Sequence, residues 1–401
     1  MALIVACAML VLPVLYLAFI AGVGQLTWWH ATHNYMWMRI PGPKIIALVL
    51  YVGLIIGGVV WICSLIRPLF MGLFRPEEEQ GGLRRKDEPL LFEFTDRLAD
   101  EVGSPRPEMI YLSLSANASA YFRSKAFGLG RRSFTLTLGV PLVAGLTLEQ
   151  LASVMAHEFG HFSQGSLVLD RLIQRVNTWF GLAVYRRGAM DNLIASLWNE
   201  ENQSILLTIV GFSLWVLLIL GRGVLWMLMC LGLIVSMTLL RRLEFNADRY
   251  SLGVIGTQSF KEATKQIVAL NVAHDAAWRH VFNRYHAQYL PDDFAEFTVS
   301  IARRSGRLKK RTNRLIRRQK PNWLSTHPPT EARIAAAKRL DLPGIFQSSL
   351  PGKALFHDFY DLSSQVSRML YELRYGPDFG PGKLIPTDEA VDAFLSVSER
   401  P

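Results

Sequence analysis

The sequence has little cysteine and little charge. Only three of its 401 residues are cysteines, and Cys7, Cys63 and Cys230 each lie inside an apolar run. Three scattered thiols exclude a disulfide framework and a cysteine-rich metal site, and they suit a reducing compartment. Charged residues make up 19% of the chain, against about 25% in soluble domains, and half of the residues are hydrophobic. This balance excludes a disordered chain and indicates a membrane protein with a sizeable water-exposed part.

Four apolar runs are candidates for membrane-spanning helices. Two of them, at about 2–24 and 45–65, reach the roughly 20 residues that a span needs. Two shorter runs, 204–220 and 224–240, are separated by Gly221-Arg222-Gly223. As one helix they would be longer than a bilayer is thick, so the glycines predict a second helical hairpin. A buried hairpin inside a soluble protein is the alternative.

The basic residues predict how the chain is oriented. The first run is longer than the apolar core of a signal peptide and has no basic residue before it, so we expect a retained anchor. The loop at 25–43 contains one arginine, Arg39, whereas segments 67–203 and 241–401 contain nearly all the basic residues. Because basic loops stay on the cytoplasmic side, both segments and both termini are predicted to face the cytoplasm.

One predicted helix carries a metal-binding pattern. It begins at Thr147, which has the spacing of a capping box with Gln150. Further along lies His157-Glu158-Phe159-Gly160-His161, where both histidines share a helical face and can bind one metal ion. Glu158 can then take a proton from water at the open position of the metal. Two structural histidines with ordinary hydrogen-bond partners are the alternative interpretation.

A third ligand is available just after the fourth apolar run, in Glu244-Phe245-Asn246-Ala247-Asp248. Glu244 and Asp248 are again on one helical face. Glu244 can bind the metal, Asp248 can accept the free ring N–H of a ligand histidine, and Ala247 is small enough for two helices to approach. For this segment alone, surface ion pairs with the neighbouring arginines are the alternative.

Together these motifs resemble those of the HtpX-type membrane zinc metallopeptidases, gluzincins related to the CAAX prenyl proteases. Two further segments are similar to motifs of this family. They are Asn117-Ala118-Ser119-Ala120-Tyr121, before an alternating strand at 133–138, and Ser325-Thr326-His327-Pro328-Pro329-Thr330-Glu331-Ala332-Arg333. The resemblance extends over about residues 85–345.

The resemblance implies one Zn²⁺ ion per subunit and a role for each matching residue. The implied ligands are His157, His161 and Glu244. Glu158 would be the general base and then the proton donor, and Asp248 would orient a ligand histidine. His327 and Arg333 would lie near the developing oxyanion.

The family likeness also implies how the substrate binds. Asn117 and Ala118 would belong to an edge strand that pairs with an extended substrate. A polar loop before a strand is the alternative for these two residues.

The implied fold is mainly α, with about four transmembrane helices in two hairpins. A cytoplasmic, zincin-like α+β metalloprotease domain with a small β-sheet would complete it. The expected division is an N-terminal transmembrane hairpin at 1–66, the first part of the protease domain at 67–203, a second hairpin at 204–240, the second part of the protease domain at 241–345, and a C-terminal tail of unassigned role at 346–401.

The implied function is that of a zinc metalloendopeptidase in the bacterial inner membrane, with its active site facing the cytoplasm. Its substrates would be proteins or peptides, among them misfolded membrane proteins. Four spans favour such quality control over the CAAX-type processing of prenylated proteins. A non-catalytic membrane adaptor with a structural metal is the alternative from another class, and a channel is disfavoured because the spans contain few ionisable residues.

The excess of positive charge, +10 over the chain, is concentrated at 303–320. Contact with anionic lipid and a simply solvated helical face explain this cluster equally well, and nucleic acid is not expected. His274, His280 and His286 are six residues apart, do not share a helical face, and are interpreted as structural.

Overall fold

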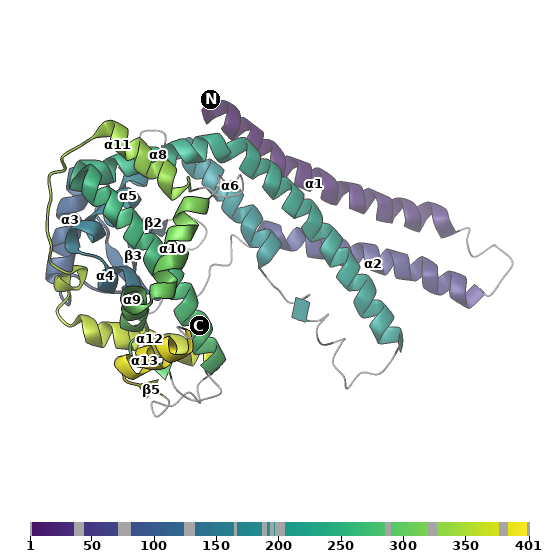
Figure 1. The fold of residues 1–401 in the computed structure, drawn as a ribbon. Helices are drawn as coiled ribbons and strands as arrows, with labels where there is room; N and C mark the ends of the chain where they lie inside the picture. Colours follow the sequence, from purple (N-terminus) through teal and green to yellow (C-terminus); the bar gives the residue numbers. More distant parts are fainter. Residues whose placement is uncertain are drawn as a thin grey trace. The chain divides into compact units, whose positions relative to one another are not determined.

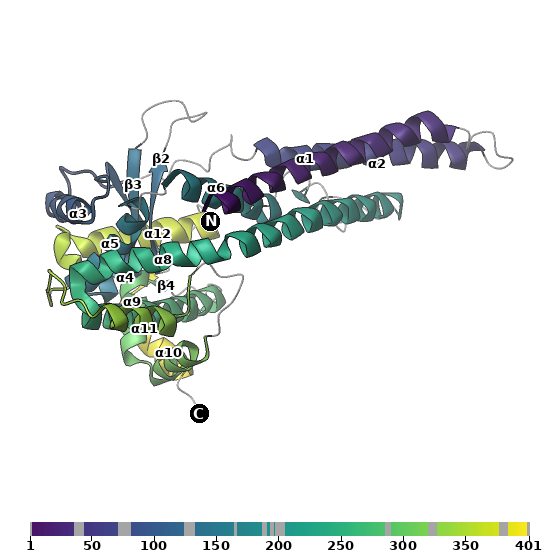
Figure 2. The ribbon, with the colours of Figure 1, turned by 90° about the horizontal axis from the view of Figure 1, so that it is seen from above.

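The computed structural model describes residues 2–35, 44–70, 82–123, 133–163, 167–186, 191–192, 196, 205–284, 290–319, 327–376 and 384–398. Of the residues considered above, Arg39, His286, Lys320, Ser325 and Thr326 lie outside this part. The chain divides into two compact units. Unit 1 comprises residues 1–77 and 166–240, and unit 2 comprises residues 78–165 and 241–401. The predicted mainly helical fold with a small sheet is confirmed (Figures 1 and 2).

Unit 1 is built on two long apolar helices, α1 (Ala2–His33) and α2 (Lys44–Phe70). They run antiparallel, because Tyr16 donates a hydrogen bond to the carbonyl of Leu65 (2.7 Å) while Tyr51 donates one to the carbonyl of Ala31 (2.6 Å). Each hydroxyl thus has a partner inside the unit, as a low-dielectric environment requires. In the described part of the chain, α1, α2 and the apolar part of α8 (Ile205–Arg284) are long and apolar enough to cross a membrane.

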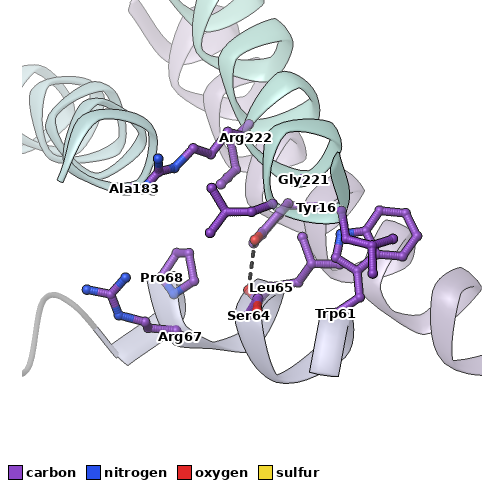
Figure 3. Close-up of a pocket in the computed structure, with 12 residues that line it drawn as sticks. Tyr16, Trp61, Ser64, Leu65, Arg67, Pro68, Ala183, Gly221 and Arg222 are labelled. Atoms are coloured by element: carbon purple, nitrogen blue, oxygen red, sulfur yellow. Dashed lines mark hydrogen bonds between the residues drawn. The ribbon is translucent and has the colours of Figure 1, made fainter. Parts of the chain in front are cut away.

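The predicted turn at 221–223 is wrong, because α8 continues through it as one helix. A glycine weakens a helix by about 1 kcal/mol and does not by itself end it. A Cβ atom on Gly221 would lie 2.9 Å from Cδ2 of Leu65, so this glycine lets α8 approach α2 (Figure 3). Arg222 forms an ion pair with Asp191 at 2.9 Å. The segment is therefore a site of helix contact within one long helix.

A further helix, α6 (Leu167–Tyr185), is the neighbour of α8 in unit 1. Asn177 on α6 donates a hydrogen bond to Oγ of Ser236 on α8 (3.0 Å). Trp179 packs edge-to-face on Tyr16 and donates a hydrogen bond to the carbonyl of Pro68 (2.9 Å). Residues 166–203, which we had expected in the first part of the protease domain, fall within unit 1.

Unit 2 contains a sheet of three strands, β1 (Met109–Ser113), β2 (Ala118–Arg123) and β3 (Ser133–Gly139). Their order is β1-β3-β2, with β1 parallel and β2 antiparallel to β3. The strand predicted at 133–138 is therefore present and is the central one. Phe134, Leu136 and Leu138 are buried on one face of this strand. Thr135, on the opposite face, is buried as well. Both faces of β3 are consequently covered.

Helix α5 (Leu148–Ser163) follows the short helix α4 (Val140–Gly145). The predicted capping box is confirmed, because the backbone N–H of Thr147 reaches Oε1 of Gln150 and the N–H of Gln150 reaches Oγ1 of Thr147, both at 3.2 Å. Leu151, Met155 and Phe159 are fully buried on one face of α5. Helix α3 (Pro89–Val102) packs against α5. The helix with the two histidines is thus held at its start and along its length.

Helix α8 changes direction at Gly256, whose φ of 78° and ψ of 169° suit only glycine. The segment Leu342-Pro343-Gly344 packs against this break. The N–H of Thr257 donates to the carbonyl of Leu342 (2.9 Å), and the N–H of Ile345 donates to the carbonyl of Val254 (2.8 Å). The backbones touch so closely that a Cβ atom on Gly256 would lie 2.4 Å from the Pro343 oxygen.

The remaining elements of unit 2 contribute to two hydrophobic cores. They are β4 (Leu290–Pro291), α9 (Phe294–Arg304), α10 (Gly306–Arg318), α11 (Thr330–Leu340), the 3-10 helix η4 (Gly352–Leu355), α12 (Phe359–Tyr375), β5 (Leu384–Ile385) and α13 (Thr387–Ser398). Tyr371 on α12 and Phe394 on α13 are buried together with Phe297 on α9. The described residues of the tail, 346–376 and 384–398, are therefore a folded part of unit 2. His280 packs on Phe297 and Phe394, which fits its predicted structural role.

The break in α8 yields a stability prediction. We expect Gly256→Ala to lower the free energy of unfolding by more than about 1 kcal/mol, because alanine disfavours a positive φ and its methyl group would strike the Pro343 carbonyl. Thermal unfolding of the detergent-solubilised protein measures the change.

Gly253→Ala is the matched control. A Cβ atom there meets nothing within 4 Å. Inside a helix this change is expected to stabilise by about 0.5–1 kcal/mol. Equal melting temperatures for the two variants would contradict the role assigned to Gly256.

Candidate metal centre and active site

The candidate site lies where α5 meets α8 within unit 2. A Cβ atom on Gly160 would lie 3.2 Å from Cα of Ala247, and Ala247 is completely buried. Two small residues thus let the helix backbones approach closely. Ala247 was predicted to serve this purpose. Gly160 was not, although a glycine in the middle of a predicted helix is a visible signal of a close contact.

The three predicted ligands converge at this contact. His157, His161 and Glu244 each offer one ligand atom, and these atoms lie within 4.8 Å of one another. Nε2 of His157 is 3.5 Å from Oε2 of Glu244, and Nε2 of His161 is 3.7 Å from Oε1. Two atoms that bind one zinc ion tetrahedrally at about 2.0–2.1 Å are about 3.4 Å apart. Both histidine–glutamate separations are close to this spacing, so the three side chains can hold one metal ion.

Asp248 connects this cluster to a third helix. Its Oδ1 lies 3.0 Å from Nδ1 of His157, so Nε2 of that ring is the nitrogen that faces Glu244. Nε of Arg333, on α11, donates to Oδ2 of Asp248 at 2.9 Å, and Nη2 donates to Oδ1. Burial would raise the pKa of the Asp248 carboxyl, but Arg333 and His157 outweigh it and hold that pKa below its ordinary value. Asp248 is therefore a fixed anion that orients His157.

The carboxylates of Glu244 and Asp248 stabilise a positive charge at the metal cluster. Burial opposes a charged His157, yet hydrogen bonds with Asp248 and Glu244 raise its pKa to about 9. Burial and the neighbouring His157 lower the pKa of His161 to about 4. These pKa shifts favour a proton on His157 in the absence of a metal. They keep His161 neutral, as a histidine that binds a metal must be. A bound divalent cation would take the place of the His157 proton.

Glu158 lies between this cluster and the sheet. Its side chain is partly buried and accepts a hydrogen bond from the backbone N–H of Ala120 on β2. Burial and, less strongly, the Glu244 carboxylate raise the pKa of Glu158 above its ordinary value, although His157 and, to a smaller extent, His327 and the Ala120 bond work against them. A carboxyl group with a raised pKa suits a residue that takes up a proton and then releases it.

His327 lies just before α11 and Arg333 lies in its first turn. Nδ1 of His327 lies 2.6 Å from Oε2 of Glu244, while 64% of the His327 side chain remains exposed. The role of Arg333 near the developing oxyanion stays a prediction; what the structure adds is its contact with Asp248. Its guanidinium is engaged by Asp248 and is mostly buried, so it acts on the site through Asp248 and His157. Only the three-dimensional structure reveals this partner.

Asn117 and Ala118 lie at the start of the outer strand of the sheet. The carbonyl of Asn117 accepts a hydrogen bond from the N–H of Gly139 (2.9 Å), and Ala118 is paired with Leu138. Among the described residues, β2 has a strand neighbour on one side only, namely β3. Its other side is therefore the edge at which an extended chain can add.

A membrane-anchored chain with such a centre has the features of a metallopeptidase. Residues 86–341 match the model of Peptidase family M48, and the chain belongs to this family. Because family and membrane helices agree, the protein is a membrane peptidase, and the family implies a metal at its centre.

Relatives in bacteria support this assignment. The protein named "Protease HtpX" in Pseudomonas putida is 26% identical over 262 residues, which are 64% of this chain and 73% of that protein. Its namesake in Haemophilus influenzae is 25% identical over 258 residues, 64% of this chain and 75% of that protein. The one in Vibrio atlanticus is 28% identical over 194 residues, 48% and 61% of the two chains. No solved structure matches.

The Asp248 contacts yield a prediction for metal affinity. We expect Arg333→Gln to weaken metal binding about 10–100-fold, because His157 loses part of the support that fixes its ring. Metal retained by the purified protein after equilibration with a graded series of chelator concentrations measures the effect.

Arg339→Gln serves as the control, since Arg339 is an exposed arginine on the same helix. Circular dichroism establishes that both variants are folded. Identical chelator curves for the two folded variants would show that Arg333 does not support the ligands.

Proposed function

We propose that this protein is a zinc-dependent metalloendopeptidase that cleaves extended segments of protein substrates. The observation that carries the proposal is the convergence of two imidazole nitrogens and one carboxylate oxygen within 4.8 Å, with Glu158 next to them and an edge strand beside Glu158. Two nitrogens and one oxygen are the donor set of a catalytic zinc site that keeps a position open for water.

His157, His161 and Glu244 would hold the metal. When bound, zinc would polarise the scissile carbonyl and lower the pKa of a water molecule to about 7. A structural zinc site normally has four protein ligands. In the described part of the chain, only these three residues form such a group, which favours a catalytic centre over the structural metal of an adaptor.

Glu158 would handle the proton. Its carboxylate would take a proton from the attacking water and then deliver it to the nitrogen of the leaving amine. Its raised pKa helps the second half of this transfer, since a protonated carboxyl is then stable long enough to donate.

His327 would have a double task. Through Nδ1 it would hold Oε2 of Glu244, and from that position it would help to stabilise negative charge on the carbonyl oxygen of the substrate. Arg333 would be a positioning residue that keeps Asp248 charged and His157 in the correct tautomer.

The substrate would lie along β2. Asn117 and Ala118 begin the free edge, and the Ala120 N–H that binds Glu158 belongs to the same strand. An extended segment added there by backbone hydrogen bonds would pass next to the general base. Because backbone pairing needs no free terminus, this favours endopeptidase cleavage of unfolded segments.

We further propose the bacterial inner membrane as the location, with unit 2 in the cytoplasm and misfolded membrane proteins among the substrates. The basic residues, which gather outside the apolar runs, support this orientation. The relatives named "Protease HtpX" agree with the HtpX-type resemblance from which this role is inferred.

The proposal predicts the behaviour of Glu158→Gln. We expect this variant to keep its metal, because Glu158 is not among the ligands, and to lose at least about 10²–10⁴-fold in cleavage rate, because an amide cannot accept the proton. Cleavage of an unfolded test protein by the detergent-solubilised enzyme, together with metal analysis of the same sample, provides the measurement.

Glu372→Gln, which neutralises an exposed carboxylate on α12, is the matched control and should cleave normally. Chelator-treated wild-type protein gives a second reference, with activity expected to return on adding zinc. Cleavage by the metal-free protein, or normal cleavage by metal-loaded Glu158→Gln, would refute the proposed chemistry.

A further inference from the structure

Helix α10 has a chemistry that the candidate active site does not use. Seven of its 13 residues are lysine or arginine, and none is acidic. Its buried residues Leu308, Thr312 and Ile316 recur every four positions and attach the helix to unit 2. Every basic residue is exposed, and these are Arg307, Lys309, Lys310, Arg311, Arg314, Arg317 and Arg318. The helix therefore has one narrow side that fixes it and a wide cationic side toward the solvent.

The cationic side is largely uncompensated. Among the described residues, no carboxylate forms an ion pair with the six basic residues from Lys309 to Arg318. Arg304, at the end of the preceding helix α9, shows the ordinary arrangement, because it pairs with Asp392 at 2.7 Å. Like charges on one helix repel one another, and such repulsion is relieved when a polyanion binds.

Several features of this side match the surface of an anionic bilayer. Arg307, Lys310, Arg311, Arg314, Leu315 and Arg318 together line one open, shallow groove. The helix is about 20 Å long, so it presents a row of cations to several headgroups at once. Arginine binds phosphate oxygens with two N–H groups, and Leu315, 45% exposed at the edge of the row, adds an apolar side chain for the boundary of the acyl region.

We propose that the exposed side of α10 binds the anionic phospholipid headgroups of the membrane that anchors unit 1. Phospholipid headgroups are the favoured partner because the apolar helices of the same chain attach it to a membrane. They thereby keep headgroups at a high local concentration around α10. Each basic residue near an anionic surface contributes to binding, so seven weak contacts suffice. Single-stranded nucleic acid is disfavoured because α10 has no aromatic side chain on which bases stack.

The test uses the full-length protein in nanodiscs. Asn313 is exposed and neutral, so a fluorophore on Asn313→Cys leaves the charge of α10 unchanged. The native thiols Cys7, Cys63 and Cys230 are replaced by alanine in this background. Lipids with a nitroxide on the headgroup report proximity by quenching. We expect quenching to increase as phosphatidylglycerol replaces phosphatidylcholine and to weaken at high salt.

Two double variants provide the matched comparison. Arg311→Gln with Arg314→Gln removes two charges from the proposed surface, and it should require at least about twofold more phosphatidylglycerol for half-maximal quenching. Arg339→Gln with Arg368→Gln removes two exposed arginines from α11 and α12 and should behave like the parent protein. Neither pair belongs to the metal cluster, so metal content should not change in either.

Three results would overturn the proposal. They are quenching that is independent of phosphatidylglycerol, an equal response of the two double variants, and displacement of the headgroups by transfer RNA or polyglutamate at a lower concentration of negative charge. The last result would assign the surface to a different polyanion. None of these outcomes depends on protease activity, so the lipid proposal and the proposed function fail separately.

Discussion

The arrangement of the site depends on one buried carboxylate. Asp248 lies on α8, contacts His157 on α5 and accepts two hydrogen bonds from Arg333 on α11. A buried charge is costly unless it is paired and hydrogen-bonded, and here both oxygens have partners. Three helices from separate parts of the sequence are thereby joined at one point. The same contact decides which nitrogen of His157 is available to a metal.

The surrounding architecture keeps those helices in place by different means. The capping box at Thr147 fixes the start of α5, and the contact between Gly160 and Ala247 sets how closely α5 and α8 approach. The glycine pair at Gly256 and Gly344 lets the chain turn sharply after the ligand-bearing part of α8. None of these contacts touches a reacting atom. Together they allow a cluster of buried ionisable groups to persist in a folded protein, where each alone would be unfavourable.

Local patterns made much of the site predictable. Residues four apart share a helical face, so the pairs His157 with His161 and Glu244 with Asp248 were visible in the sequence. The capping box and the central strand also depend on neighbours in the chain. The partner of Arg333 was not predictable, because its contact with Asp248 joins residues 85 positions apart. The helical repeat predicts which side chains lie on the same face of a helix. Which residues of other helices they contact is decided by tertiary packing.

The wrong turn at 221–223 has an instructive cause. Glycine marks turns because it adopts many backbone conformations, but it also marks places where two helices touch. Gly221 is of the second kind, against Leu65, whereas Gly256 is of the first. Helix α6 escaped notice because Asp170, Arg171 and Arg175 interrupt its apolar residues. The residue types alone do not show whether a glycine marks a turn or a contact between helices.

The C-terminal segment has a practical consequence for anyone who wishes to produce the water-exposed unit by itself. The match to the family model ends at residue 341. Tyr371, Val391 and Phe394, however, lie beyond that point and are buried against Phe297 and other residues of α9. An expression clone that stopped at the family boundary would leave an open hydrophobic surface where those side chains belong. Any shortened clone should therefore extend through α13.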